Sequence, residues 1–210
     1  MCLSHYKRLI FQWGLLSLFL LINLPALAQW ELGGIIGFNF AGINVDPGSS
    51  NEEYGGRVGF GIGTVVDRQL NEVIDLHFEP MYLQKGGKIK TTDFVAVYKA
   101  NYIEIPGFAR FTLNMNDSYK PYAMAGISIG FLTKAKYDYK DGGEQPASAD
   151  TRSLDMGAGL GGGVKIPLEN KHFFAELRYM WGFINMNKEN NESTVKNQGL
   201  QILAGMTIPL

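Results

Sequence analysis

Residues 172–184 read HFFAELRYMWGFI, and their side chains alternate between two unlike faces. Successive side chains of an extended strand point to opposite sides. One face is therefore apolar and consists of Phe173, Ala175, Leu177, Tyr179, Trp181 and Phe183. The other face mixes charge, glycine and bulky side chains, with Glu176 and Arg178 near its centre. This two-residue period predicts a β-strand that separates an apolar environment from a polar one.

The same period recurs along the chain and predicts eight strands. They cover approximately residues 30–40, 54–66, 72–85, 99–113, 120–132, 153–166, 172–184 and 197–208. The short connections contain turn-forming Asp, Asn or Glu and lie at 67–71, 114–119 and 167–171. The long, polar connections lie at 41–53, 86–98, 133–152 and 185–196. An even number of strands with alternating short turns and long outside loops is typical of an outer-membrane β-barrel.

The first 28 residues predict a segment that is removed on export. A basic start and an apolar stretch at 9–24 precede Ala26-Leu27-Ala28, which has the small-x-small pattern of a signal peptidase site. We expect the general secretory route to be used and the cut to fall between Ala28 and Gln29. Residues 1–28 are then a signal peptide and residues 29–210 an outer-membrane β-barrel domain. Mass spectrometry of the membrane-purified protein tests this expectation, and a retained 1–28 segment would contradict it.

The composition of the mature chain excludes several classes of function. The single cysteine, Cys2, lies in the removed segment, so no disulfide, thiol nucleophile or cysteine-ligated metal site can form. Removal of Lys7 and Arg8 leaves 17 basic and 20 acidic residues, a net charge of −3 that does not attract nucleic acid. No later apolar run approaches about 18 residues, so no transmembrane helix is expected.

The direction of the apolar face distinguishes a membrane barrel from a soluble one. The polar face carries many glycines, among them Gly59, Gly61 and Gly63. Glycine adds nothing to a solvated surface, but inside a narrow barrel it leaves room for large side chains. Aromatic residues gather at the ends of the apolar face, as two interfacial girdles require. We therefore expect an all-β fold, an eight-stranded antiparallel up-and-down transmembrane β-barrel whose apolar face meets outer-membrane lipid.

Charged residues of both signs are expected to line the interior. They are Asp75, His77, Glu79, Glu104, Arg110, Asp155, Glu176 and Arg178. If the strands at 72–85 and 99–113 pair, Asp75 and Arg110 should face each other inside. The acids and bases are expected to neutralise one another, and the bulky inner side chains are expected to close the narrow lumen.

His77 with Asp75 and Glu79 is the one cluster that invites a catalytic interpretation. Catalysis also needs a nucleophile or activated water and access for the substrate, whereas His77 lies far from both rims of the predicted barrel. A metal site needs a ligand spacing that these residues lack in the sequence. The glycine runs at 59–63 and 159–163 open no helix and precede no Gly-Lys-Ser/Thr, so they do not indicate a phosphate-binding loop. The sequence predicts no catalytic residue, no metal and no cofactor.

Several short motifs resemble the PorT-like family of small outer-membrane β-barrel proteins. They are Tyr102-Ile-Glu-Ile-Pro106, Lys120-Pro-Tyr-Ala-Met-Ala-Gly126, Glu79-Pro-Met-Tyr-Leu-Gln-Lys-Gly86, Asp155-Met-Gly-Ala-Gly159 and Glu176-Leu-Arg-Tyr179. The resemblance covers nearly all of 31–208 and implies an eight-stranded barrel of the outer membrane. It also implies a link to protein secretion, because the founding member is associated with a gliding-linked export system. The end of the chain, Met206-Thr-Ile-Pro-Leu210, departs from the pattern because it lacks the final aromatic residue common in barrel-assembly signals.

The expected role is therefore structural or interactive and not enzymatic, acting through the outside loops or as an accessory to a secretion complex. The expected partners are outer-membrane lipid, the barrel-assembly machinery and an envelope or secretion-complex protein. Three alternatives stay open from the sequence: a small-solute pore, a barrel enzyme acting on lipid or peptide, and a soluble calyx that carries an apolar ligand. The pore requires an open interior, the enzyme a reactive set near a rim, and the calyx an apolar interior.

Overall fold

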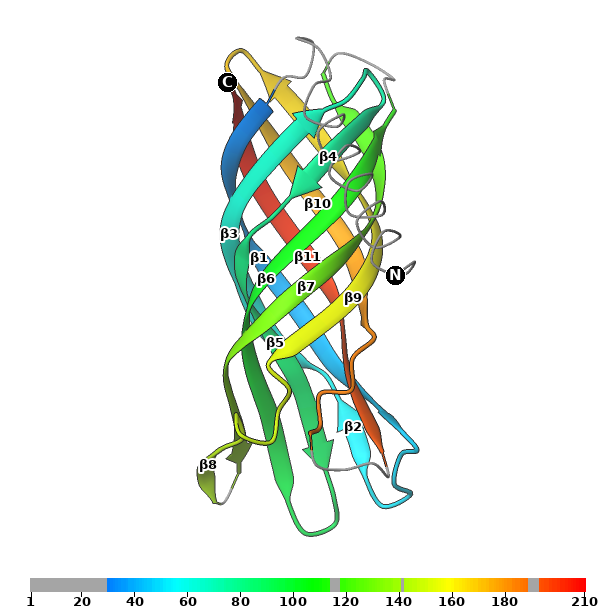
Figure 1. Ribbon diagram of the computed structural model, residues 1–210, viewed down its shortest axis with the longest axis vertical. Helices are drawn as coiled ribbons and strands as arrows, with labels where there is room; N and C mark the ends of the chain where they lie inside the picture. Colours follow the sequence, from blue (N-terminus) through cyan, green and yellow to red (C-terminus); the bar gives the residue numbers. More distant parts are fainter. Residues whose placement is uncertain (1–29, 114–117, 141, 189–192) are drawn as a thin grey trace, which may run out of the picture.

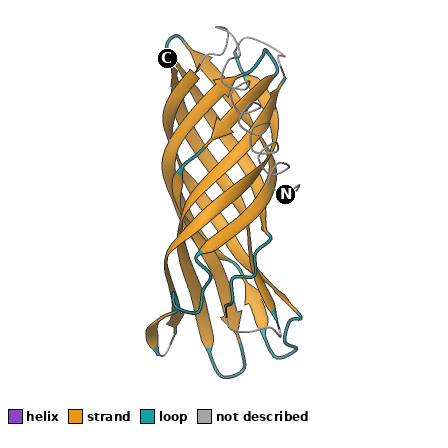
Figure 2. Cartoon of the chain, viewed as in Figure 1, coloured by secondary structure: helices purple, strands orange, loops and turns teal. Residues whose placement is uncertain are grey.

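The chain forms a closed ring of antiparallel strands in the computed structural model, which describes residues 30–113, 118–140, 142–188 and 193–210. The strands wind around a common axis (Figure 1), and Figure 2 shows only strands and loops among the described residues. Their bounds are β1 (Trp30–Asp46), β2 (Glu53–Gly55), β3 (Arg57–Gln69), β4 (Ile74–Phe78), β5 (Met81–Lys90), β6 (Val95–Thr112), β7 (Lys120–Tyr139), β8 (Gly143–Pro146), β9 (Leu154–Leu168), β10 (Lys171–Gly182) and β11 (Thr194–Pro209). Within the described residues, no helix is long and apolar enough to cross a membrane.

Eight positions make up the ring. β1 pairs with β3 on one side and with β11 on the other, and the ring continues through β10, β9, β7 and β6. β4 and β5 together fill the remaining position, because both lie between β3 and β6. Every described pairing is antiparallel, and the register of β1 with β11 runs from Glu31↔Pro209 to Asp46↔Thr194. The predicted eight-stranded antiparallel barrel is thereby confirmed.

The strands run further at one end than the sequence predicts. β1 continues to Asp46, β6 begins at Val95 and β7 ends at Tyr139, so parts of the predicted loops at 41–53, 86–98 and 133–152 are strand. This is the end with β2 and β8, at the bottom of Figure 1, opposite the C-terminus. Because long connections of such barrels face outside, it is the extracellular end. Beyond the lipid, the outer side of each strand meets water, so backbone pairing continues after the apolar outer face has ended.

Two irregularities interrupt the ring. The predicted strand 72–85 is split after Phe78, because Pro80 has no backbone N–H to give to a ladder. The neighbouring strands bridge the break: Thr64 N donates to the Pro80 carbonyl at 3.0 Å, and Glu79 N to the Pro106 carbonyl at 3.1 Å. The pairing of β6 with β7 shifts its register between Asn101 and Tyr102 of β6. There the Thr133 hydroxyl of β7 donates to the Asn101 carbonyl at 2.9 Å.

The apolar face points outward along the ring. Large side chains such as Ile36 (58% exposed) and Ile127 (63%) lie on the outer surface, whereas charged residues of the same strands are buried. Exposed aromatic residues mark both ends of this band: Phe38, Phe40, Phe131, Trp181 and Phe183 towards the outside, and Phe111 and Phe173 towards the periplasm. This arrangement matches a lipid-facing band with two aromatic girdles and contradicts the soluble calyx, which needs its apolar face inside.

Glycines on the inner face allow the large polar side chains to cross the lumen. A Cβ atom on Gly161 would lie 2.5 Å from both the Arg178 Cβ and the Leu177 carbonyl oxygen. Such a contact is too close for any side chain, so the strand beside Arg178 requires glycine at this position. The same crowding explains why glycine and arginine share one face in the sequence.

Candidate functional site

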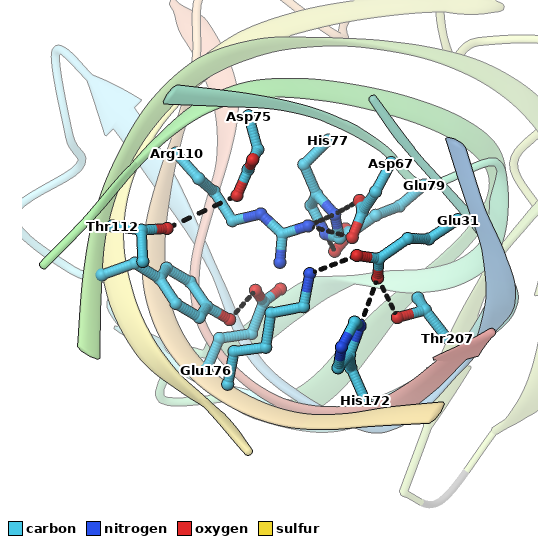
Figure 3. Close-up of polar contacts among 12 residues, drawn as sticks. Glu31, Asp67, Asp75, His77, Glu79, Arg110, Thr112, His172, Glu176 and Thr207 are labelled. Carbon is cyan, nitrogen blue, oxygen red and sulfur yellow. Dashed lines mark hydrogen bonds and ion pairs between the residues drawn. The ribbon is translucent and has the colours of Figure 1, made fainter. Parts of the chain in front are cut away.

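The structure places all eight charged residues assigned to the interior inside the barrel, each no more than 8% exposed. β4 carries Asp75 and His77, and Glu79 follows it directly. Glu104 and Arg110 lie on β6, Asp155 on β9, and Glu176 and Arg178 on β10. All but Asp75 join three connected groups of polar contacts, and Figure 3 shows the one around Arg110, seen along the barrel.

The first group surrounds Arg178, on the inner face of β10. Its guanidinium pairs with Glu79 and with Glu176 Oε1 at 3.0 Å, and its Nε donates to Gln201 Oε1 at 2.7 Å. The guanidinium carbon lies 4.8 Å from the centre of the Phe108 ring. The second oxygen of Glu176 accepts a hydrogen bond from the Tyr122 hydroxyl at 3.0 Å. One buried cation thus holds two buried carboxylates.

The second group surrounds Arg110, one layer closer to the periplasm. Arg110 pairs with Asp67, and both side chains are almost completely buried. His77 connects the two groups, because its Nδ1 contacts Asp67 while its Nε2 lies 2.5 Å from Glu79 Oε1 (Figure 3). The interior therefore holds a continuous chain of alternating acids and bases.

The ion-pair partner of Arg110 differs from the sequence expectation. Asp75 and Arg110 are register partners, as expected from the pairing of their strands. The guanidinium nevertheless pairs with Asp67, while Asp75 accepts a hydrogen bond from the Thr112 hydroxyl at 3.4 Å. Asp67 was assigned to the turn at 67–71 but lies in β3, and its alternation with Val65 on the inner face was the signal that could have found it.

The third group lies closer to the outside. Lys85 pairs with Glu104 and, at 3.1 Å, with Asp155 Oδ2. Asn197 donates to the same Asp155 oxygen at 2.8 Å. The interior role of Lys85 was not predicted, although it continues the inner face of β5 two residues after Leu83.

A fourth set of contacts lies at the periplasmic mouth, around Glu31. One carboxylate oxygen lies 2.7 Å from Lys165 Nζ, and the other lies 3.0 Å from His172 Nδ1 and accepts a hydrogen bond from the Thr207 hydroxyl at 2.5 Å (Figure 3). These residues come from β1, β9, β10 and β11, so the contacts tie four strands together at the mouth of the barrel.

One set of side chains has a spacing that a metal ion could use. Ligand atoms of His77, Glu79 and Glu176 lie within 4.8 Å of one another, a proximity that the sequence spacing did not indicate. The existing contacts already satisfy these atoms, because His77 bridges two carboxylates and Arg178 pairs with both glutamates. Arg178 supplies the positive charge that a metal ion would bring.

The surroundings of His77 do not resemble a catalytic centre. Its described polar contacts are Asp67, Glu79 and Arg110, and its ring meets the Phe174 ring edge-on at 5.8 Å. None of these neighbours is a hydroxyl or thiol nucleophile, and His77 is 0% exposed. The contacts of His77 neutralise buried charges and hold side chains in place across the barrel.

Comparison with protein families and solved structures agrees with this architecture. Residues 23–188 match the protein family described as outer membrane protein beta-barrel domain. No curated protein sequence is significantly similar to the chain. Among solved structures, the outer membrane protein OprG from Pseudomonas aeruginosa shares the fold with a TM-score of 0.55 and 10% identity, over 87% of this chain and 96% of OprG. Neisserial surface protein A (NspA) aligns with a TM-score of 0.48 and 18% identity, over 86% and 96% of the two chains.

The family match spans most of the chain, and it agrees with the outward apolar face and the two aromatic girdles. The OprG likeness independently supports the barrel fold. The chain belongs to the outer membrane protein beta-barrel domain family and is an integral barrel of the outer membrane.

Proposed function

We propose that the protein is a closed, non-enzymatic barrel that acts through its extracellular end, as a recognition element or as a support for another envelope protein. The membrane-embedded part then serves as an anchor that holds the extracellular strand extensions in a fixed arrangement. The interior carries no traffic of solutes and no reaction.

The observation that carries this proposal is the stack of ion-paired layers across the lumen. Arg110 and Arg178 are each 1% exposed, and aromatic rings pack against both guanidinium groups. An eight-stranded barrel has an interior just wide enough for its own side chains. Layers of this kind support a closed interior and oppose the small-solute pore.

The enzyme alternative is opposed by the position of the reactive groups. A barrel enzyme acting on lipid or peptide needs a nucleophile or activated water within reach of a rim. His77 is instead buried between carboxylates in the middle of the barrel. The groups that would have to react are therefore the least accessible ones.

An accessory role in protein secretion is the more specific form of the proposal. It is supported by the resemblance of several motifs to PorT-like proteins, and it suits a rigid anchor with long outside extensions. Affinity purification of the tagged protein from native membranes tests it. A secretion-complex protein should be recovered with the intact chain but not with a variant that lacks β8 (Gly143–Pro146), a segment outside the ring.

Recordings in planar lipid bilayers test the closed interior. The purified protein should show no steady conductance steps, and Arg152→Ala, which changes an exposed arginine, should behave in the same way. The double variant Arg110→Ala/Arg178→Ala, once shown by circular dichroism to be folded, should also stay closed, because Lys85, Glu104 and Asp155 still fill the lumen nearer the outside. Steady, large steps from a homogeneous preparation of the unmodified protein would refute the closed interior and favour the pore.

A further inference from the structure

A cavity at the extracellular end takes no part in the ion-paired groups. The extensions of β1, β5, β6, β7 and β11 line it, together with β2. Its volume is about 310 Å³. Small-molecule sites typically occupy about 300–1,000 Å³, so the cavity has room for one small ligand.

The floor of the cavity is apolar and well packed. Tyr98 and Met186 contribute to both the lining and a buried cluster that includes Tyr102. The Tyr102 hydroxyl donates to Met186 Sδ at 3.5 Å, and the Tyr98 hydroxyl lies 3.0 Å from Thr151 Oγ1. This layer separates the cavity from the group around Lys85, so a ligand reaches the cavity from the outside.

The lining of the cavity carries aromatic rings at three places. Tyr54 projects from β2, Tyr98 from β6 and Tyr137 from β7. The rings of Tyr98 and Tyr137 pack with their centroids 5.2 Å apart. The negative face of an aromatic ring attracts a cation that lies within about 6 Å of it. Such walls suit a ligand with an apolar body and a positive charge.

The charged side chains of the lining have one sign. They are Glu52 and Asp150, and the described lining contains no lysine, arginine or histidine. Glu52 accepts a hydrogen bond from the Tyr54 hydroxyl at 2.5 Å, so its carboxylate is held at the wall. Burial raises the pKa of the Tyr137 phenol, and nearby Tyr139 and Asp150 raise it further. Both charges that line the cavity are therefore negative.

We propose that this extracellular cavity binds small organic cations, namely amines or quaternary ammonium compounds with an aromatic or short aliphatic body. The apolar body packs on the tyrosine and methionine floor, while the positive group lies near Glu52 and Asp150. An anionic ligand of the same shape is repelled by both carboxylates. The site rests on the proposed function, since it gives the extracellular end of the barrel a specific class of ligand.

Binding of matched probes to the full chain in lipid nanodiscs tests the site. Benzyltrimethylammonium should bind in isothermal titration calorimetry, while benzenesulfonate, of similar size and opposite charge, should not. The double variant Glu52→Gln/Asp150→Asn keeps the shape of the lining and should weaken binding of the cation at least fivefold. Asp93→Asn removes an exposed carboxylate outside the lining and should leave the affinity unchanged. Empty nanodiscs give the background from probe that partitions into lipid.

Ala147→Trp adds a large side chain to the floor, where Ala147 is buried, and should abolish binding while the barrel stays folded on unheated gels. The site is refuted if benzenesulfonate binds as tightly as the cation, if the double variant binds the cation as well as the unmodified protein does, or if no cation binds. Bilayer recordings on the same preparation separate the two proposals. A barrel that conducts but binds the cation retains this site and loses its closed interior, whereas a closed barrel without binding loses only the site.

Discussion

Replacement of Arg178 by methionine tests the idea that ion pairing inside the lumen holds the barrel together. Methionine keeps part of the aliphatic length of arginine but removes the guanidinium group. Glu79 and Glu176 would then lose their shared cation, and Gln201 would lose the donor at 2.7 Å. The packing of the guanidinium over the Phe108 ring would be lost as well.

The expected loss follows from the burial of these groups. Removing one partner of a buried ion pair costs about 3–5 kcal/mol, because the other charge is left without compensation. The double variant Glu79→Gln/Arg178→Met removes one of the two abandoned charges. Its loss should therefore be smaller than the sum of the two single losses by about 0.5–3 kcal/mol, the size of coupling measured between residues in one network.

Equilibrium unfolding in urea from lipid vesicles, followed by tryptophan fluorescence, measures these differences. Arg152→Met is the matched control, because Arg152 is exposed and its replacement should change the free energy of unfolding by less than about 0.5 kcal/mol. Equal losses for Arg178→Met and Arg152→Met would refute the reasoning. So would a double variant that is less stable than Arg178→Met by the full cost of a second independent substitution.

Two further sets of substitutions test the register and the packing of the interior. In double-mutant cycles of unfolding, Arg110→Leu should couple to Asp67→Asn by about 1–3 kcal/mol, because the guanidinium pairs with Asp67. The coupling of Arg110→Leu to Asp75→Asn should be weaker. A stronger coupling to Asp75 would contradict the observed pairing. Gly33→Ala should impair folding, since its Cβ would lie 1.9 Å from the Met206 carbonyl oxygen. Gly34→Ala should be nearly neutral, because the atom nearest to its Cβ is 3.8 Å away. Folded yields on unheated gels compare the two variants, and equal yields would show that the inner face tolerates a methyl group at position 33.

The alternation of side chains was sufficient to predict the barrel, because it is a local property of each strand. Leu177 and Arg178 are adjacent in sequence, and their opposite environments follow from the geometry of an extended chain. The inner position of the charged residues and the lipid-facing position of the aromatic residues both followed from this two-residue alternation. The number of strands followed from turn residues and the alternating lengths of the connections. Cleavage after Ala28 stays a prediction, since residues 1–29 lie outside the described residues.

The partners inside the lumen and the shape of the extracellular end were decided by the tertiary structure. Strand tilt brings together side chains far apart in the sequence, such as Arg178 with Glu79 and Lys85 with Asp155. The two-residue alternation shows only which face of the strand a residue lies on. It therefore could not show that Asp67, and not another inner acid, is the partner of Arg110. The strand extensions beyond the membrane were missed because their outer side meets water, so the apolar outer face that marks a membrane strand in the sequence ends before the strand does. The cavity itself exists only where those extensions meet.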